Sequence, residues 1–142
     1  MSKRVLYIED NPRNMLLVQR IVEAEGHEFI GAVDGESGWK TAVSAHPDLI
    51  LMDLRLPGEI TGFELTRRIR QHEPLHHTPI IAVTAYGSDE AEKRARAAGC
   101  DGFLCKPADI RQIQALLREY LGQKPAIKQT APEAAKVSYV FL

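Results

Sequence analysis

Residues 48–57 read DLILMDLRLP, and this stretch decides the fold. The four residues 49–52 are all apolar, with no polar alternation, which is typical of a parallel strand buried on both faces of its sheet. The run ends in Asp53, and Pro57 marks the loop beyond it. A strand buried in this way needs helices on both sides of its sheet. The rest of the chain should therefore supply further strands and the helices that cover them.

The sequence around this strand alternates short apolar runs with amphipathic stretches. Strands are predicted at 4–8, 28–33, 48–52, 80–83 and 103–105, and helices at 12–26, 36–45, 63–71, 88–98 and 110–121. Asn11 and Pro12 offer an N-cap and a first-turn proline for the first helix. Strict alternation with right-handed crossovers favours an α/β fold. We expect a doubly wound five-stranded parallel sheet of flavodoxin-like order 2-1-3-4-5, with five helices.

The periodic pattern stops near residue 121. Residues 1–121 are predicted to form one domain, which is close to the usual domain size. From Gly122 the composition shifts to Gln, Lys, Ala, Thr and Pro, so residues 122–142 are predicted to be a Pro/Ala/Lys-rich linker. The linker ends in an apolar tip, Val137 to Leu142. An exposed β-prone hexamer invites association, so we expect the tip to contact this domain or a second copy.

The composition narrows the classes of partner. The chain has 18 basic and 19 acidic residues and a formal net charge of −1, so no long-range field attracts nucleic acid or membranes. We expect no direct DNA binding and no membrane association. The first residues lead into a strand without the apolar stretch of a secretory signal, which indicates a cytoplasmic protein. Cys100 and Cys105 lack the spacing of a zinc site and are expected to be reduced, partly buried thiols.

Polar residues directly follow four of the predicted strands: Glu9 and Asp10, Asp53, Thr84, and Lys106. In an open doubly wound sheet, ligands bind beyond the carboxyl ends of the strands where strand order reverses, here between the first and third strands. Each residue alone has an ordinary explanation as a cap, a turn or a loop residue, but together they favour a site. Three neighbouring carboxylates call for a cation, and oxygen ligands suit Mg²⁺. Asp53 is then the best placed nucleophile for a phosphoryl group.

The ordered set Glu9-Asp10, Asp53-Leu-Arg-Leu-Pro57, Gly62, Thr84-Ala85 and Lys106-Pro107 resembles the receiver domains of two-component response regulators over residues 3–121. The resemblance is to the stand-alone, chemotaxis-type members. It implies that Asp53 accepts a phosphoryl group from a partner sensor histidine kinase or histidine phosphotransfer protein. Mg²⁺ would be held by Asp10, Asp53 and the backbone carbonyl of Arg55, with Glu9 acting through water; Mn²⁺ fits the same ligands. Such a protein is not an enzyme beyond its own phosphorylation and dephosphorylation.

The resemblance also implies a switch. Lys106 and Ala85 would contact the phosphoryl group, Thr84 would move to hydrogen-bond it, and Phe103 takes the place of the family's switch aromatic. A new dianion that draws a hydroxyl inward opens space for a ring to follow. The face formed by the fourth helix, fifth strand and fifth helix would then change its contacts with a downstream protein target. The bond between Lys106 and Pro107 is expected to be cis.

Two side chains are expected to control the lifetime of the acyl phosphate. Arg55 and Tyr86 stand two residues beyond Asp53 and Thr84, where the resemblance places residues that flank the phosphate. Both are large enough to obstruct attacking water, which predicts slow hydrolysis. The loop 58–61 holds one residue more than this family usually has.

Several alternatives stay open. The chain could act as a phosphoryl shuttle to a histidine phosphotransfer protein or as a phosphorylation-independent adaptor. A phosphatase of the haloacid dehalogenase type needs a second acid two residues after its nucleophile, where this chain has Arg55. A homodimer is an option through the fourth helix, fifth strand and fifth helix, or through the tail. Five arginines interspersed with acids are predicted to form an ordinary solvated surface: Arg67, Arg68, Arg70, Arg94 and Arg96.

Overall fold

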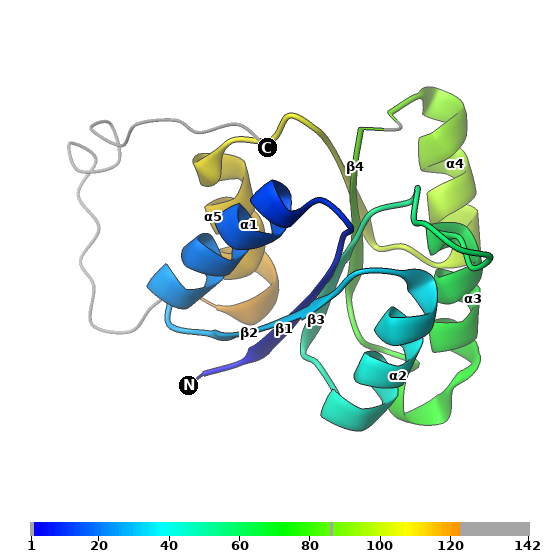
Figure 1. Ribbon diagram of the computed structural model, residues 1–142, viewed down its shortest axis with the longest axis horizontal. Coiled ribbons are helices and arrows are strands. Elements are labelled where there is room, and N and C mark those ends of the chain that lie inside the picture. The colour runs from blue at the N-terminus through cyan, green and yellow to red at the C-terminus, as the bar shows by residue number, and fades with distance from the viewer. Residues whose placement is uncertain (1, 86, 123–142) are drawn as a thin grey trace.

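The computed structural model describes residues 2–85 and 87–122, so the predictions for Tyr86 and for residues 123–142 of the tail lie outside the described residues. Strands and helices alternate along the chain as predicted (Figure 1). A short 3₁₀ turn, η1 (Glu73–Leu75), was not predicted. The elements are β1 (Arg4–Ile8), α1 (Pro12–Ala24), β2 (Glu28–Ala32), α2 (Gly35–Ala45), β3 (Leu49–Met52), α3 (Gly62–Gln71), β4 (Ile80–Thr84), α4 (Asp89–Ala98), β5 (Gly102–Cys105) and α5 (Ile110–Leu121).

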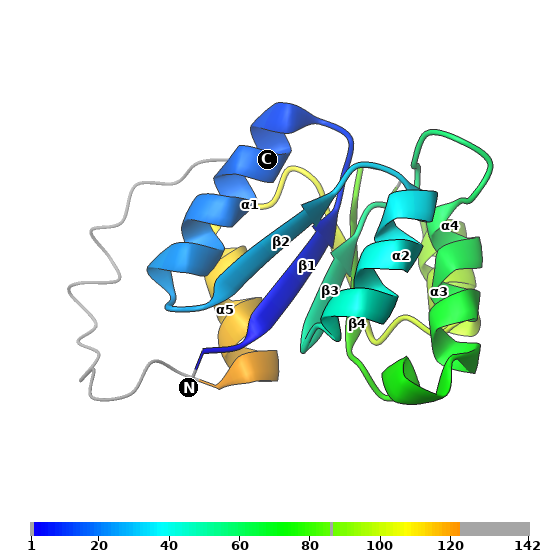
Figure 2. The same cartoon turned by 60° about the horizontal axis from the view of Figure 1, so that its bottom comes forward.

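The strands form one parallel sheet in the order β2-β1-β3-β4-β5, which confirms the predicted topology. Figure 2 shows β2, β1, β3 and β4 side by side. β3 lies at the centre of the sheet, and its four side chains are fully buried, as its unbroken apolar sequence indicated. The central position of β3 places the residue after it, Asp53, in the middle of the sheet edge.

Two helical layers cover the sheet. α1 and α5 lie over one face, and α2, α3 and α4 lie over the other (Figure 1). Side chains along β1 alternate between the two cores: Val5 and Tyr7 belong to the α1/α5 side, and Leu6 and Ile8 to the opposite side. Each layer therefore has its own apolar core, and residues two apart on a strand share a face.

Polar caps fix where the helices begin. The side chain of Asn11 accepts hydrogen bonds from two backbone N–H groups of α1, and Ser88 caps α4 through the N–H of Ala91. α1 ends at Ala24, two residues earlier than predicted, because Gly26 has a φ of +88° and turns the chain. The other predicted bounds differ from the observed ones by at most one residue.

α4 has an unusual inner face for a helix of this length. Its buried residues are alanines only, Ala91, Ala95 and Ala98. Arg94 of α4 adds a cation–π contact, with its guanidinium carbon 4.2 Å from the ring centroid of Phe63 in α3. Because a methyl group buries little apolar area, hydrophobic packing holds α4 weakly against the sheet.

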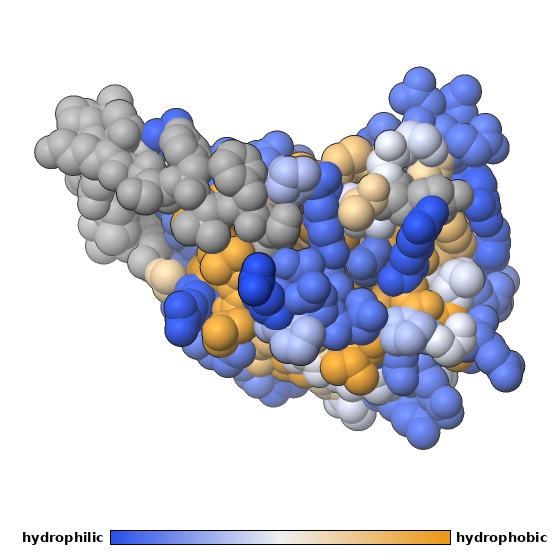
Figure 3. All heavy atoms as spheres, turned by 45° about the horizontal axis from the view of Figure 1, so that its top comes forward, coloured by the Kyte–Doolittle hydropathy of each residue, from blue (hydrophilic) through white to orange (hydrophobic). Residues whose placement is uncertain are grey.

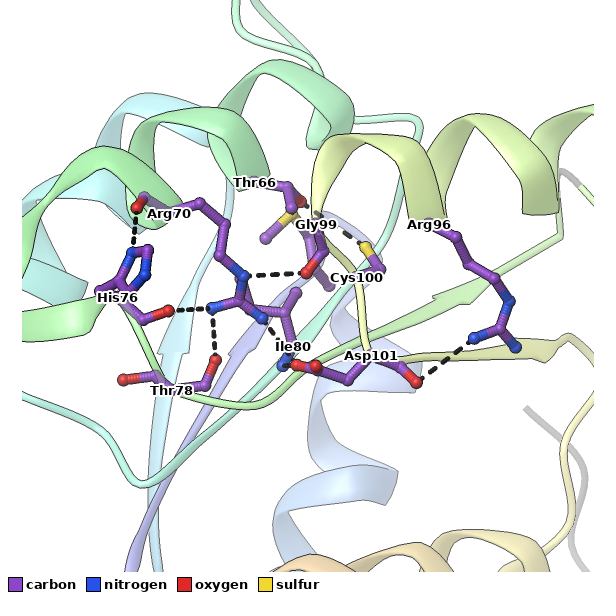
Figure 4. Close-up of polar contacts among 10 residues, drawn as sticks. Thr66, Arg70, His76, Thr78, Ile80, Arg96, Gly99, Cys100 and Asp101 are labelled. Carbon is purple, nitrogen blue, oxygen red and sulfur yellow. Dashed lines mark hydrogen bonds and ion pairs between the residues drawn. The ribbon is translucent and has the colours of Figure 1, made fainter.

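Arg70, in the last turn of α3, joins that helix to residues 76–78 and 99–101 at the edge of the sheet where the strands begin (Figure 4). Its guanidinium donates to the carbonyl oxygens of Gly99 at 2.9 Å, Thr78 at 2.7 Å and His76 at 3.2 Å, and pairs with the Asp101 carboxylate at 2.6 Å. We call these groups the Arg70 cluster. The side chain of Arg70 is only 18% exposed. The prediction of an ordinary solvated arginine surface is therefore wrong for this residue.

The two thiols differ from each other. Both are free; Cys100 is buried, whereas Cys105 is exposed rather than partly buried as predicted. Burial raises the pKa of the Cys100 thiol. No helix within the described ranges combines the length and the apolar character needed to cross a bilayer.

Candidate functional site

The polar residues that follow the strands come together at one edge of the sheet. The N–H of Asp53 donates to the carbonyl of Ile8 at 3.0 Å, which places the end of β3 beside the end of β1. The N–H of Lys106 donates to the carbonyl of Thr84 at 2.9 Å and joins the ends of β5 and β4 in the same way. The predicted convergence of four strand ends is therefore present.

Figure 3 brings this edge of the molecule forward. Hydrophilic residues gather across the middle of the visible face, with hydrophobic patches on either side. A hollow of about 320 Å³ opens beside Asp53. Its lining comes from the ends of β3 and β4 and from the start of α4: Asp53, Arg55, Thr84, Ala85, Gly87 and Ser88.

Asp53 is held by donors on both of its carboxylate oxygens. The hydroxyl of Thr84 donates to Oδ1 at 2.7 Å, and the backbone N–H of Arg55 donates to the same oxygen at 3.1 Å. Lys106 Nζ donates to Oδ2 at 3.2 Å. Asp53 is 7% exposed, so its carboxylate is fixed in orientation yet reachable from the hollow.

Glu9 is more deeply buried, at 1% exposure. Its Oε1 accepts a hydrogen bond from the Tyr7 hydroxyl at 2.9 Å and pairs with Lys106 Nζ. Its Oε2 accepts from the backbone N–H of Asn11 at 3.0 Å. Lys106 thus bridges the carboxylates of Glu9 and Asp53, with its own side chain 9% exposed.

Tyr7 is the residue that the sequence reasoning missed. The sequence 4–8 was interpreted only as an apolar strand, and Tyr7 is fully buried in the α1/α5 core. Its i, i+2 spacing to Glu9 was the available signal, since such residues share a face of a strand. Burial, with the neighbouring Glu9 and Asp53 carboxylates, raises the pKa of Tyr7, so its hydroxyl keeps its proton.

Three carboxylates of the site are close enough to share one cation. One oxygen from each of Glu9, Asp10 and Asp53 lies within 4.8 Å of the others. Asp10 is exposed, whereas Glu9 and Asp53 are buried. Lys106 supplies one positive charge against these three acids, so the cluster fits a divalent cation with hard oxygen ligands.

Gly62 lets the chain return close beneath the site. Its N–H donates to the carbonyl of Leu54 at 3.1 Å. A Cβ at this position would come within 2.6 Å of the Asp53 carbonyl oxygen and 2.7 Å of the Leu54 Cα. The longer loop 58–61 lies instead against the start of α2, where a Cβ on Gly35 would come within 2.7 Å of Ile60 Cβ.

The other predicted site residues occupy the rim and the neighbouring face. Ala85 is exposed and lines the hollow with Arg55. The Lys106–Pro107 peptide bond is cis, the geometry that the resemblance implies. Phe103 lies on the edge strand β5, partly buried against the core on the α2, α3 and α4 side.

Comparisons with known proteins agree with this arrangement. The model of the response regulator receiver domain matches residues 5–118. Among curated proteins, the polar-differentiation response regulator DivK of Brucella ovis is 40% identical over 122 residues, which cover 86% of this chain and 98% of DivK.

Two solved structures show the same architecture. The chemotaxis response regulator CheY4 of Vibrio cholerae superposes with a TM-score of 0.80 at 28% identity and covers 85% of this chain and 100% of its own. The receiver domain of the sensor histidine kinase PA1611 of Pseudomonas aeruginosa PAO1 gives a TM-score of 0.78 at 31% identity, with coverage of 87% and 100%. That crystal structure has a magnesium ion coordinated in its active-site cleft.

Proposed function

Because this chain belongs to the response regulator receiver domain family, we propose that it is a stand-alone phosphorylation switch whose acceptor is Asp53. The donor is a phosphohistidine of a sensor histidine kinase or histidine phosphotransfer protein. The observation that carries the proposal is the setting of Asp53, a nearly buried carboxylate at the end of the central strand with Thr84 on one oxygen and Lys106 on the other. The receiver domain is taken as residues 1–121, and its place of action as the cytoplasm.

Glu9, Asp10 and Asp53 fit a divalent cation, and the magnesium ion in the related PA1611 receiver domain supports Mg²⁺. Asp10, Asp53 and the backbone carbonyl of Arg55 would hold it, with Glu9 acting through water; Mn²⁺ suits the same oxygen ligands. A bound cation would supply positive charge to the phosphoryl oxygens and reduce repulsion among the acids.

Several residues of the chain then have separate roles in the phosphoryl transfer. An Asp53 carboxylate oxygen attacks the phosphorus, forming an O–P bond as the N–P bond to the donor histidine breaks. The electron pair of that bond returns to the departing imidazole. Lys106, already 3.2 Å from Asp53 Oδ2, pairs with the new phosphoryl oxygens. The backbone at Ala85, on the rim of the hollow, offers a further contact.

The switch follows from what Thr84 contacts before phosphorylation. Its hydroxyl donates to Asp53 Oδ1 at 2.7 Å, and a phosphoryl group on Asp53 would present stronger acceptors and draw the hydroxyl toward it. Phe103, partly buried on β5, would move into the space behind Thr84. The alanine-only inner face of α4 favours this readout, because small side chains resist a shift of the helix weakly. The α4, β5 and α5 face would then present a changed surface to a downstream protein.

The test is phosphorylation of the purified chain by acetyl phosphate with Mg²⁺, in which acetate is the leaving group, followed by intact mass measurement. We expect the mass of one phosphoryl group to be added to the wild type and to Asp89→Asn, and not to Asp53→Asn. Asp89 is a matched control, because it is an exposed aspartate in the first turn of nearby α4. No mass gain in the wild type, or equal gain in Asp53→Asn, would contradict the proposal.

A further inference from the structure

Tyr7 is a buried tyrosine, and the one polar atom of its side chain, the hydroxyl oxygen, faces the site. The ring is fully buried among the residues between the sheet and the α1/α5 layer. Its hydroxyl donates to Glu9 Oε1 at 2.9 Å. A residue whose ring simply filled the core at this position would not need a hydroxyl, so the hydroxyl has to be explained by its contact with Glu9.

Glu9 has three hydrogen-bond donors, and only one of them belongs to a group that must move. Lys106 Nζ and the Tyr7 hydroxyl donate to Oε1, and the backbone N–H of Asn11 donates to Oε2. A divalent cation at the cluster of Glu9, Asp10 and Asp53 would repel Lys106 Nζ from Glu9 even before a phosphoryl donor binds, and in the proposed reaction Lys106 then turns toward the phosphoryl group. Glu9 would then keep one donor on each oxygen, from Tyr7 and Asn11, both of which lie two residues away in the chain.

We propose that Tyr7 is a positioning residue of the site, which holds the Glu9 carboxylate in the orientation required for cation binding when Lys106 leaves it. The inference rests on the proposed function. Without the Tyr7 hydroxyl, a buried Glu9 that loses Lys106 would keep only the Asn11 N–H on one oxygen. Its other oxygen would be free to rotate away from Asp10 and Asp53. Outer groups that orient a metal ligand commonly contribute tenfold or more to metal affinity.

The test compares Mg²⁺ binding to the wild type and to Tyr7→Phe by isothermal titration calorimetry, with no phosphoryl donor present. Tyr7→Phe removes the hydroxyl and keeps the ring that fills the core. We expect its dissociation constant for Mg²⁺ to rise about tenfold, and phosphorylation by acetyl phosphate to recover at saturating Mg²⁺. Tyr120→Phe is the control, because Tyr120 is a partly buried tyrosine at the border of the same core. Its affinity for Mg²⁺ should match that of the wild type.

A double-mutant cycle with Glu9→Gln separates positioning from packing. If Tyr7 acts through Glu9, Tyr7→Phe should weaken Mg²⁺ binding far less in the Glu9→Gln background than in the wild type. An equal effect in both backgrounds would overturn the inference, as would wild-type affinity in Tyr7→Phe. A wild-type chain that binds no Mg²⁺ would overturn the proposed function as well. The outcomes therefore distinguish a failure of the inference about Tyr7 alone from a failure of the proposed function as well.

Proton NMR of the Tyr7 hydroxyl in the wild type gives a second test, which does not depend on how the variants fold. A buried hydroxyl proton donated to a carboxylate exchanges slowly and should give a resolved proton resonance for Tyr7. We expect this resonance to persist when Mg²⁺ is added and to be absent in Tyr7→Phe. Its loss on addition of Mg²⁺ to the wild type would show that Tyr7 no longer holds Glu9, and would overturn the inference.

Discussion

Replacing Arg70 by alanine should be among the most destabilising single changes in α3. The side chain is 18% exposed and donates to three backbone carbonyls and to Asp101. The substitution would leave the carbonyls of Gly99 and Thr78 without this donor and open space above Gly99, whose hypothetical Cβ would lie 2.6 Å from Arg70 Cγ. Asp101 would keep the backbone N–H of Ile80 at 2.9 Å.

The loss of unfolding free energy in Arg70→Ala can be estimated from these contacts. Two short bonds from a charged donor to carbonyl oxygens contribute about 1.5 kcal/mol each. The ion pair adds less than about 1 kcal/mol, because the side chain of Asp101 is 44% exposed. The total is roughly 3 kcal/mol of unfolding free energy, or about 10 °C in melting temperature for a domain of this size. Arg70→Lys should recover less than half of it, because an ammonium cannot reach the same acceptors together.

Urea unfolding followed by circular dichroism measures this difference, with Arg68→Ala as the matched control. Arg68 lies on the same helix, is 43% exposed, and makes an i, i+4 pair with Glu64 at 3.6 Å. Its removal should cost less than about 0.5 kcal/mol. If Arg70→Ala loses no more stability than Arg68→Ala, the reasoning about the Arg70 cluster is wrong. Phosphorylation of the folded fraction should be unchanged, since Asp101 of the cluster binds the N–H of Ile80, where β4 begins, whereas Asp53 follows the end of the parallel strand β3.

Three further predictions concern the site and the pH dependence of folding. Arg55→Ala and Tyr86→Ala should each speed the decay of the acyl phosphate, measured by mass over time; unaltered decay in both would refute shielding. Gly62→Ala should cost about 2 kcal/mol or more in urea unfolding, because its Cβ would lie 2.6 Å from the Asp53 carbonyl oxygen; a smaller loss would show that the loop yields easily. Burial lowers the pKa of His27, so the unfolded chain binds more protons and stability should fall as pH drops from about 7 to 6. His27→Gln should flatten this dependence, and an unchanged slope in urea unfolding at pH 7.5 and 6 would contradict it.

The order of the elements could be predicted because local sequence determines it. Asn11 caps the first helix, as predicted, and the apolar run 49–52 became the central strand. The 3₁₀ turn Glu73–Leu75 was missed because it depends on two short-range hydrogen bonds, from the N–H of Leu75 to the carbonyl of His72 and from the N–H of His76 to the carbonyl of Glu73, which have no periodic sequence pattern.

The convergence of strand-end residues was also predictable, since parallel strands deliver their carboxyl ends to one edge. The orientation of each side chain within the site was not. Tyr7 looked like one more apolar residue, and only the tertiary structure shows its hydroxyl on Glu9. Arg70 looked like a surface charge in sequence, but it lies over Gly99 because no Cβ stands in its way. Neither contact could be predicted, because the partners of Tyr7 and Arg70 are determined by tertiary packing rather than by spacing in the sequence.

The separation between the Arg70 cluster and the Asp53 site has a consequence for how this chain can evolve. Substitutions that tune metal binding or phosphate lifetime act at the carboxyl ends of the strands, whereas Arg70 and Asp101 secure the ends where β4 and β5 begin. Independent sites more than about 7–10 Å apart contribute additively to stability. A lineage could therefore change its signalling chemistry at one edge and restore lost stability at the other, without the two sets of changes constraining each other.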